Sequence, residues 1–525
     1  MSTAYIALLV LFIVYVPIWV WAWLRPDAAA RWHLQKYGPC LMIRTRLGMR
    51  TMDRLARYGR FWRAFGFMSK LVSAVLFLMM MYMLIVAVIA LPRTLSSGSG
   101  IGIEYALAIP GFNPIMPLSY GIVALVVAMV VHELAHGIQS RVNGIRVESS
   151  GLLYGVVPLG AFVEPNEEEL GRATRRARTD VYAAGITVNT IVAVLSILIM
   201  ACACGCVGSD YDDNAGAYYI DRGSPAYEAG IPASALITGV AVYTDEAPFP
   251  YADVSAGASG TSAYLDYRFD PTQSYSLRYV YKGGTFDTGP VQMGAYVKTI
   301  SAGSAAESSG IQLGSFIYSI TVDGMEVLIG SPHDFTEAMS RTSPGQTVIV
   351  STVDAGASEA VDRTVVLTAN GSKGFLGVAC TTGGMTLTTP GILLSMASDP
   401  FYGADSAYGH VQSFFSYLSG PFNGMDPISD EIEWWYDAPG DHVFWAVVRM
   451  LYWLFWLDIL LAISNALPTR VLDGGYIFSG GVDWMLERAG VRDRERREEL
   501  TESVTGSVST VTLFLFMLVI LAMVM

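Results

Sequence analysis

The stretch Val131-His132-Glu133-Leu134-Ala135-His136 closes an apolar run that begins at Gly121. Residues four apart share one face of an α-helix, so the imidazoles of His132 and His136 can reach a single tetrahedral zinc ion. Glu133 is the next residue round the helix, where its carboxylate is placed to accept a proton from zinc-bound water. The alternative is a chance match in which both histidines hydrogen-bond to neighbouring helices.

The motif lies inside residues 115–138, a segment of about the length that crosses a bilayer. Ionisable groups at that depth are costly and by default mark a functional site. Arg141 and Arg146 follow the segment, and by the positive-inside rule they put its end on the cytoplasmic side. At the helical rise per residue, His132 then lies roughly 13 Å below the cytoplasmic surface. We therefore expect a metal site within the membrane.

The composition is that of a membrane protein with additional soluble parts. Of 525 residues, 52% are hydrophobic and 15% are charged, and the mean hydropathy is +0.42. The formal net charge of -13 argues against nucleic acid as a partner. The 5 cysteines form no disulfide framework, because Cys40 and Cys380 are isolated. Cys202, Cys204 and Cys206 crowd one helix end, where a thiolate metal site or lipidation is an alternative to small apolar residues at a membrane boundary.

Apolar segments predict about six transmembrane helices. They are residues 4–24, 71–91, 115–138, 181–203, 443–467 and 507–525. The first lacks a basic region before it and a small-residue cleavage site after it, so we interpret it as a retained anchor. Residues 25–70 are strongly basic, which predicts a cytoplasmic loop and an external N-terminus. The mixture of arginine and aromatic residues in this loop favours an interfacial helix on anionic lipid over a nucleic-acid site.

Residues 151–165 are apolar, rich in glycine, proline and β-branched residues, and too short to span a bilayer. We expect a hairpin or re-entrant strand pair beside the metal site, because unpaired backbone at membrane depth must be covered by protein or water. A plain interfacial loop is the alternative. Such a strand can pair with another extended chain, and Gly155, Gly160 and Phe162 are the candidate residues of this segment for that pairing.

Residues 208–395 change in character to many short apolar runs among Gly, Ser, Thr, Tyr and Asp, which predicts a mostly β extracytoplasmic region. Residues 217–231 are echoed by residues 295–311 as an internal repeat. The shared strand, Gly-Ser turn, short helix and Gly-Ile exit resemble the PDZ domains of membrane and periplasmic proteases, which accept an extended chain end by strand addition. The alternative is that one or both copies are packing modules with a closed groove, above all the first.

The fifth span leads into Asn465-Ala466-Leu467-Pro468-Thr469-Arg470-Val471-Leu472-Asp473-Gly474-Gly475. An Asp-Gly-Gly alone signals only a turn, but this one follows an inward-running span at the predicted depth of His132. We expect Pro468 and the glycine pair to break the helix and Asp473 to be the third zinc ligand. Arg449 and Asp458 interrupt the span, so we expect them to face the bundle interior. In the acidic connector before the span, Trp434, Trp435 and Tyr436 are predicted interfacial anchors.

These motifs together resemble the site-2 protease family of intramembrane zinc metalloproteases. The resemblance rests on His132-Glu133-Leu134-Ala135-His136, then Ala184-Gly185-Ile186-Thr187-Val188-Asn189, then Asn465-Ala466-Leu467-Pro468 with Leu472-Asp473-Gly474. Pro158-Leu159-Gly160-Ala161-Phe162-Val163 is similar to the membrane-inserted β-segment of that family. The resemblance implies zinc on His132, His136 and Asp473, Glu133 as general base, and Asn189 and Asn465 as active-site polar groups. The chain departs from the family at Arg470, where apolar or proline residues are usual.

The predicted fold is a polytopic α-helical membrane protein with a mostly β extracytoplasmic region of two PDZ-like domains. The predicted divisions are 1–92, 114–206, 210–288, 289–380, 395–441 and 442–525. The resemblance implies a Zn²⁺ metalloendopeptidase that cuts transmembrane proteins and is in contact with membrane lipid. The placement of the arginines puts its active site toward the cytoplasm. From the external PDZ-like modules we expect substrates whose external domain has already been trimmed. The alternatives are a proteolytically inactive PDZ-bearing receptor and a transporter, although the inverted repeat expected of a transporter is missing from the sequence.

Overall fold

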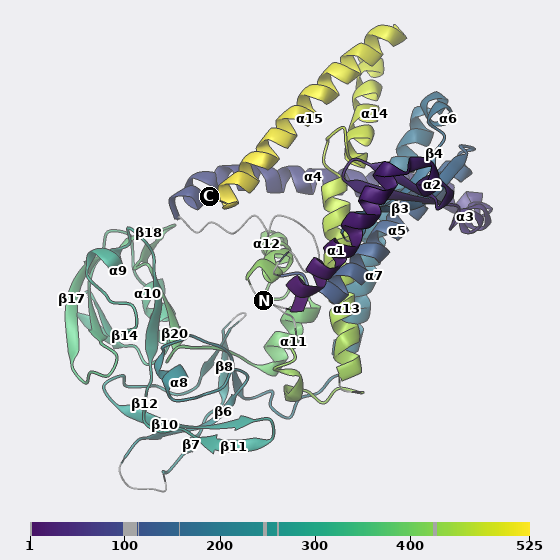
Figure 1. The fold of residues 1–525 in the computed structure, drawn as a ribbon. Coiled ribbons are helices and arrows are strands. Elements are labelled where there is room, and N and C mark those ends of the chain that lie inside the picture. Colours follow the sequence, from purple (N-terminus) through teal and green to yellow (C-terminus); the bar gives the residue numbers. More distant parts are fainter. Residues whose placement is uncertain are drawn as a thin grey trace. The chain divides into compact units, whose positions relative to one another are not determined.

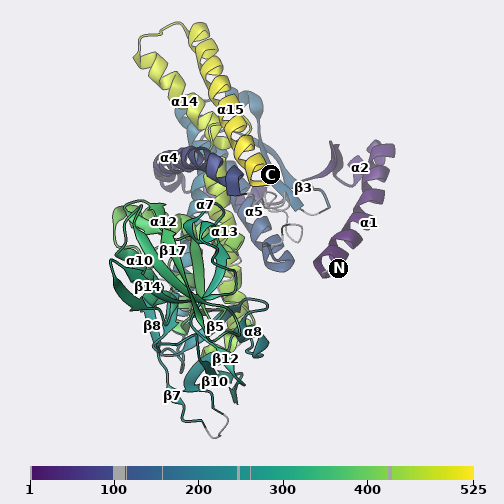
Figure 2. The same ribbon diagram turned by 90° about the vertical axis from the view of Figure 1, so that its left-hand side faces the viewer.

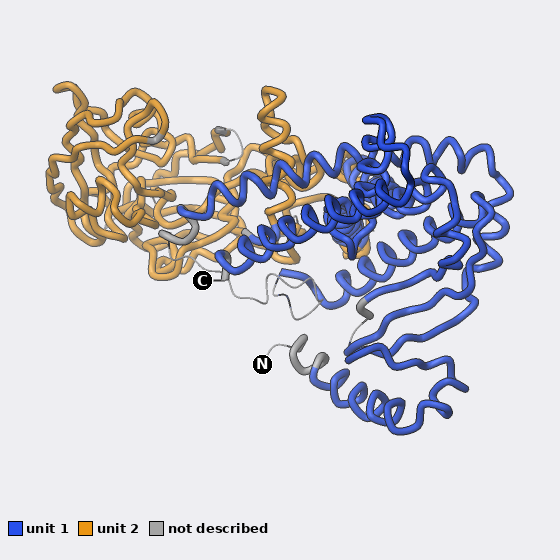
Figure 3. Tube along the Cα trace, turned by 90° about the horizontal axis from the view of Figure 1, so that it is seen from above, with its two compact units in different colours: residues 1–202, 421–424, 447–525 blue, residues 203–420, 425–446 orange. Residues whose placement is uncertain are grey.

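The computed structural model describes residues 3–97, 113, 115–156, 158–244, 249–259, 262–423, 428–440 and 442–524. The chain divides into two compact units, which Figure 3 colours separately. Unit 1 contains Met1–Cys202, Pro421–Gly424 and Val447–Met525, and unit 2 contains Ala203–Gly420 and Met425–Ala446. Unit 1 therefore carries both predicted metal motifs, and unit 2 carries the internal repeat.

Long apolar helices dominate unit 1 (Figure 1). Among the described residues, five helices have the length and hydropathy to cross a membrane: α4 (Gly59–Ser97), α5 (Leu118–Val142), α7 (Arg175–Cys204), α13 (His442–Asn465) and α15 (Arg494–Val524). They correspond to five of the six predicted spans. The other predicted span is α1 (Thr3–Leu24), whose described apolar part, Leu9–Leu24, is shorter. Helices of this length and hydropathy are those of an integral membrane protein.

A small antiparallel sheet lies beside α5. Its described strands follow the order β1 (Leu34–Tyr37), β2 (Cys40–Thr45), β3 (Val147–Tyr154) and β4 (Pro158–Pro165). The predicted hairpin of residues 151–165 corresponds to the β3–β4 pair, in which Gly151 stands opposite Phe162 and Leu153 opposite Gly160. Helix α6 (Glu167–Arg172) follows β4, and the side chain of Asn166 caps it by accepting the N–H of Glu169.

The prediction of an interfacial helix in the basic loop is wrong for residues 34–45. That loop forms α2 (Pro26–Arg31), the β1–β2 hairpin and α3 (Met49–Ala56). Strand β2 pairs with β3, from Leu41 opposite Tyr154 to Thr45 opposite Ser150. The partner strand lies more than a hundred residues along the chain, so the β2 segment takes its conformation from a contact that local sequence patterns do not reveal.

Unit 2 is built on a large antiparallel sheet, which in the described residues contains 13 strands. The first repeat supplies β5 (Ala215–Ile220), α8 (Pro225–Glu228), β6 (Leu236–Val242), β7 (Ala252–Asp253), β10 (Ser274–Tyr281), β11 (Gly284–Asp287) and β12 (Val291–Gln292), with a separate hairpin of β8 (Ala256–Ser259) and β9 (Ser262–Leu265). The second supplies β13 (Ala295–Ile300), α9 (Ala305–Ser308), β14 (Phe316–Val322), β15 (Met325–Leu328), α10 (Pro332–Ser340), β16 (Thr347–Val353) and β17 (Ala360–Val366), with a hairpin of β18 (Thr368–Asn370) and β19 (Lys373–Phe375). Strands β20 (Val378–Thr382) and β21 (Met385–Thr388) complete the sheet.

The internal repeat is visible as a repeated set of contacts. Ser224 caps α8 and Ser304 caps α9 through their side-chain oxygens. Each serine lies so close to a glycine, Gly384 and Gly377 respectively, that a Cβ on the glycine would be 2.1 or 2.2 Å from the serine Cβ. Both glycines also have positive φ, which a side chain would strain. One continuous segment, residues 376–388, therefore closes both copies.

The two apolar cores of unit 2 overlap along the chain. Met385 and Leu387 of β21 lie in the first core, beside Val291 and Met293. The second core draws on residues between Ala295 and Leu376. We call each repeat with its core a module. The first module is completed by β21, which follows the second module in the chain, so the first core extends beyond the predicted range 210–288.

The aromatic connector of unit 2 contains α11 (Pro390–Ser398), α12 (Ala407–Ser419) and short 3-10 helices at Gly420–Asn423 and Glu433–Trp435. Trp435 is buried, and its indole N–H donates to the carbonyl of Ser234 at 2.8 Å. The Trp435 ring fills the space above Gly216, where a Cβ would be 2.2 Å from it. Trp435 and Tyr436 are therefore packing residues of unit 2, and the prediction that they are membrane-interface anchors is wrong.

Candidate metal centre

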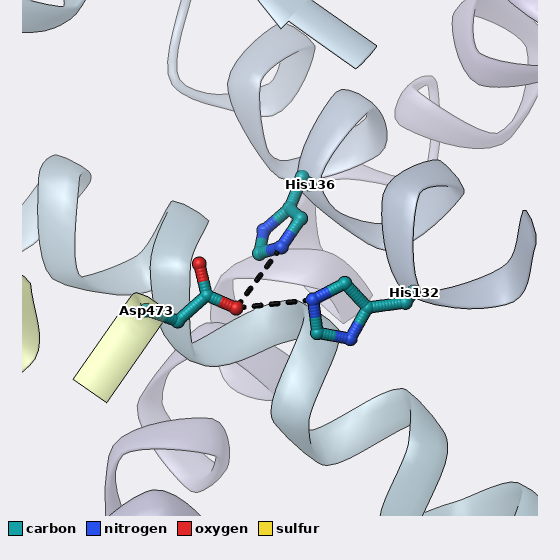
Figure 4. A group of neighbouring side chains, drawn as sticks. All are labelled: His132, His136 and Asp473. Atoms are coloured by element: carbon teal, nitrogen blue, oxygen red, sulfur yellow. Dashed lines mark hydrogen bonds and ion pairs between the residues drawn. The ribbon is translucent and has the colours of Figure 1, made fainter. Parts of the chain in front are cut away.

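The side chains of His132, His136 and Asp473 converge on one point in unit 1 (Figure 4). The Nε2 atoms of His132 and His136 lie 3.1 and 3.2 Å from Oδ2 of Asp473. The histidines occupy successive turns of α5, and Asp473 is the first residue of α14 (Asp473–Arg488). Two sequence motifs more than three hundred residues apart are thus brought to one site, as the sequence predicted.

The chain reaches this geometry because two glycines permit close packing at the start of α14. A Cβ on Gly474 would lie 2.4 Å from the carbonyl oxygens of Ala466 and Leu467, and one on Gly475 would lie 2.0 Å from that of Thr469. Pro468 ends α13, as predicted. The glycine pair does not break a helix, however, because Gly474 and Gly475 lie in the first turn of α14, packed on the preceding loop.

A carbonyl oxygen on α7 orients one of the two imidazoles. Nδ1 of His136 lies 2.7 Å from the backbone oxygen of Val181. Because a carbonyl only accepts, Nδ1 carries the proton and Nε2 presents its lone pair to the centre, as in metal-ligating histidines. Both histidines are buried, with 6% and 7% of their surface exposed.

Gly185 of α7 faces the same point. A Cβ at this position would lie 2.6 Å from Nε2 of His136 and 2.7 Å from Nε2 of His132. Any side chain here would therefore occupy the space to which the three ligand atoms point. The sequence does not predict this role for Gly185, because an isolated glycine amid apolar helical residues is its only signal.

Glu133 lies beside the centre and is held toward the sheet. Its Oε2 accepts the backbone N–H of Val163 in β4 at 2.9 Å. Glu133 lines the same cavity as the two histidines and Asp473, but its carboxylate is not one of the three clustered ligand groups. This is the arrangement expected of a proton acceptor that is not itself a ligand.

A cavity of about 540 Å³ opens onto these residues. Helix α5 forms one wall and strand β4 another. Asn465 and Asp473 approach from the α13–α14 side. The remaining lining comes from Met129, Gly160, Ala161, Glu164, Pro165, Glu167, Leu170, Val181, Tyr182, Leu461, Val471, Leu472 and Tyr476.

The other predicted site residues are placed differently. Asn465 and Gly160 line the cavity, whereas Asn189 is fully buried one turn beyond Gly185 on α7 and outside the cavity lining. Within the described part of the chain, neither polar side-chain atom of Asn189 has a hydrogen-bond partner. Phe162 covers Gly151 with its ring, and Gly155 lies in the connection between β3 and β4. Neither of these two residues is part of the cavity lining.

Two further features of the site lay beyond the sequence patterns. Tyr182 of α7 and Tyr476 of α14 stack in parallel at the cavity, with ring centroids 4.2 Å apart. At the far end of α14, Asp483 forms ion pairs with Arg175 and Arg497. Burial opposes the ionisation of Asp483, but the hydrogen bond from Arg497 and the charge of Arg175 hold the pKa of its carboxyl below the usual range. Helix α14 is thus anchored to α7 and α15 at that end.

The residues present fit a zinc ion. Two imidazole nitrogens and one carboxylate oxygen, all within 4.8 Å of one another, form a ligand set typical of catalytic zinc sites. The proton on Nδ1 of His136 and the space left by Gly185 favour a ligand at the point of convergence. The fold and the site together define a membrane protein with a buried His-His-Asp cluster that could hold a metal ion.

Comparison with known proteins identifies the family. The sequence model of Peptidase family M50 matches residues 120–513, and the chain belongs to this family of site-2-protease-type metallopeptidases. Members of the family are in general zinc-dependent. An uncharacterised protein of Methanocaldococcus jannaschii is 32% identical over 195 residues, which is 37% of this chain and 51% of that protein. The chain thus spans about half the length of this relative.

Proposed function

We propose that this protein is an intramembrane zinc metalloprotease that hydrolyses peptide bonds in or near the transmembrane segments of membrane-anchored substrates. One observation carries the proposal. Glu133, the three ligands His132, His136 and Asp473, and strand β4 all border one cavity. The cavity thus joins a proton acceptor, a metal centre and a strand able to pair with substrate.

The protein's own residues divide the chemistry among them. His132, His136 and Asp473 would hold Zn²⁺, which when bound lowers the pKa of a water and polarises the substrate carbonyl. Glu133 accepts the proton from the attacking water and returns it to the leaving amine, while the N–H of Val163 keeps its carboxylate in place. Asn465 lines the cavity, and we assign to it a hydrogen bond to the substrate backbone.

Strand β4 presents the substrate. In the described sheet β4 is the last strand, paired with β3 on one side only, and Gly160, Ala161 and Val163 line the cavity. A substrate helix conceals its carbonyls in its own hydrogen bonds, so it must be unwound before attack. Adding one extended segment to β4 would exchange those hydrogen bonds for hydrogen bonds to the sheet. The substrate carbonyl would then be exposed beside Glu133.

We further propose that unit 2 lies outside the membrane and selects substrates. In its second module β20 pairs with β13 along one side, pairs with β21 only at Thr382 opposite Met385, and has α10 beside it. Across the described residues, the N–H groups of Leu376 and Gly377, just before β20, make no hydrogen bond. These features suit an extended chain end added to β20.

The first module differs at the corresponding place. Where the second module has α10, the first has the β8–β9 hairpin, and β9 lies beside the closing strand β21. A hairpin in that position leaves less room for a peptide. We therefore assign reading of a chain end to the second module and packing to the first.

The catalytic part of the proposal is tested by replacing Glu133. The Glu133→Gln variant should abolish cleavage of a single-span test substrate in vesicles while its zinc content stays near that of the parent. His136→Ala should lose both zinc and cleavage. Glu148→Gln, on an exposed side chain bonded to Asn166, is the control and should change neither.

The same cleavage assay distinguishes the proposed protease from the main alternative, a proteolytically inactive receptor. A receptor would leave the test substrate intact with Glu133 present, and its partner binding would not depend on this carboxylate. Undiminished cleavage by Glu133→Gln would refute the assigned mechanism.

A further inference from the structure

The loop that carries Asp473 is fastened to the last helix of the chain. The backbone N–H of Arg470 donates to the side-chain oxygen of Ser509 at 3.0 Å. The guanidinium of Arg470 donates from Nη2 to the backbone carbonyl of Glu502 at 2.6 Å. Both acceptors belong to α15, which packs along α14 (Figures 1 and 2).

A glycine on α15 admits the arginine. A Cβ on Gly506 would lie 2.8 Å from Nη2 and 3.2 Å from Cζ of Arg470. Any larger residue would push the guanidinium away from the helix. The space left by the missing side chain of Gly506 is here called the notch. Gly506 follows Glu502 by four residues, so the notch and the accepting carbonyl of Glu502 are on the same face of α15.

The same loop is pressed against the start of α14 from the other side. Gly475 lies so close to Thr469 that a Cβ would be 2.0 Å from its carbonyl oxygen and 3.1 Å from the nitrogen of Arg470. Residues 469–470 are therefore held between α14 and α15. Only two residues separate Arg470 from Asp473, which leaves little freedom to absorb a displacement of the loop.

Arg470 itself is not part of the cavity. Its neighbours Val471 and Leu472 line the cavity, whereas the Arg470 side chain points to α15. Contact with substrate therefore does not account for an arginine at this position, and attachment of the loop does.

We infer that Arg470, seated on Gly506 of α15, is a positioning residue that holds Asp473 at the metal centre. The inference rests on the metal site of the proposed function and not on proteolysis. Loss of the attachment lets the loop and the Asp473 carboxylate shift, and the affinity for zinc falls. The C-terminal helix is thereby part of the metal-binding machinery, although none of its residues reaches the metal.

A double-mutant cycle on the full-length protein in detergent tests this coupling. Arg470→Met removes the guanidinium and keeps an apolar stem, and Gly506→Ala fills the notch. Zinc dissociation constants are measured by competition with a chromophoric chelator. The d–d absorption spectrum of the Co²⁺-substituted protein reports the ligand geometry directly.

Each single substitution should weaken zinc binding by about tenfold, as for other residues that orient metal ligands. The double variant should be no weaker than Arg470→Met alone, because the added methyl has no guanidinium to displace. Arg470→Lys, which keeps one donor, should fall between parent and Arg470→Met. Gly481→Ala on α14, where a Cβ meets nothing within 4 Å, is the matched control and should bind like the parent.

Additive losses in the cycle, or parental zinc affinity and Co²⁺ spectrum in both single variants, would overturn the inference. If Arg470→Met does not fold, Gly506→Ala and Arg470→Lys still decide it. The result is independent of the proposed activity, since the coupling to zinc can hold even if the parent protein cuts no test substrate.

Discussion

At the residue scale, the candidate metal centre depends on the absence of a side chain at Gly185 as much as on its three ligands. Gly185 contributes no atom to the centre, yet it keeps clear the space between His132 and His136. Val181 contributes only a carbonyl, which fixes the tautomer of His136. Both residues lie on α7, which carries none of the three ligands. The ligands define the chemistry, and these neighbours determine whether the chemistry can occur.

Gly185→Ala tests this reading. The added methyl would stand within 2.7 Å of the Nε2 atoms of both histidines. Zinc affinity should fall by at least about tenfold, while circular dichroism shows that the helices remain, because alanine favours helix over glycine. Gly171→Ala, where a Cβ meets nothing within 4 Å, serves as control. Parental zinc affinity in Gly185→Ala would show that the metal does not lie at the point of convergence.

At the scale of elements, the sheet beside α5 depends on a segment from the N-terminal part of the chain. Strand β2 supports β3, and β3 in turn supports β4 at the cavity. The β2–β3 contact is close at Gly151, where a Cβ would lie 2.0 Å from the carbonyl oxygen of Ile43 and 2.6 Å from the ring of Phe162. The position of the proposed substrate strand therefore depends on residues far outside the metal motifs.

Gly151→Ala should separate substrate presentation from metal binding. Displacing β3 from β2 shifts β4, so cleavage of a single-span substrate should fall by about tenfold, while zinc content stays at the parental level because the ligands lie on α5 and α14. Cleavage and zinc are measured on the same preparation. A parallel loss of zinc, or no loss of cleavage, would argue against β4 as the substrate strand.

Some features of the site and the fold could be predicted from the sequence, and others could not. The pairing of Asp473 with His132 and His136 could be predicted because metal ligands follow a narrow pattern of residue types and spacing. Burial of Arg449 and Asp458 could be predicted because charge is costly in an apolar span, and both are buried. The β1–β2 hairpin could not, since its conformation depends on pairing with distant β3.

At the scale of the whole molecule, one chain combines a membrane-embedded unit with a β unit of two interlocked modules. The second module is inserted into the first, because β21 closes the first core after the second module is complete. No local sequence pattern predicts this insertion. The burial of Trp435 is likewise not predicted, because the sequence around it is typical of an interfacial anchor. A deletion that ends before β21 would leave an unpaired strand.

Removal of unit 2 modules should therefore extend through β21. We expect that replacing residues 212–388 by a flexible linker lets the protein cut a substrate that still carries its full external domain, because the selecting module is gone. The comparison is the rate for full-length against trimmed substrate, with zinc content as the control for folding. If the deletion variant binds zinc, cuts the trimmed form and still discriminates as the parent does, the modules do not select substrates.

The central claim is that His132, His136 and Asp473 form one zinc site, and metal analysis of the purified protein tests it most directly. The account predicts about one zinc per chain in the parent, and loss of that zinc in His132→Ala and in Asp473→Ala. His410→Ala, on an exposed histidine of unit 2, should retain it. Zinc retained at the parental level by His132→Ala or Asp473→Ala would contradict the account.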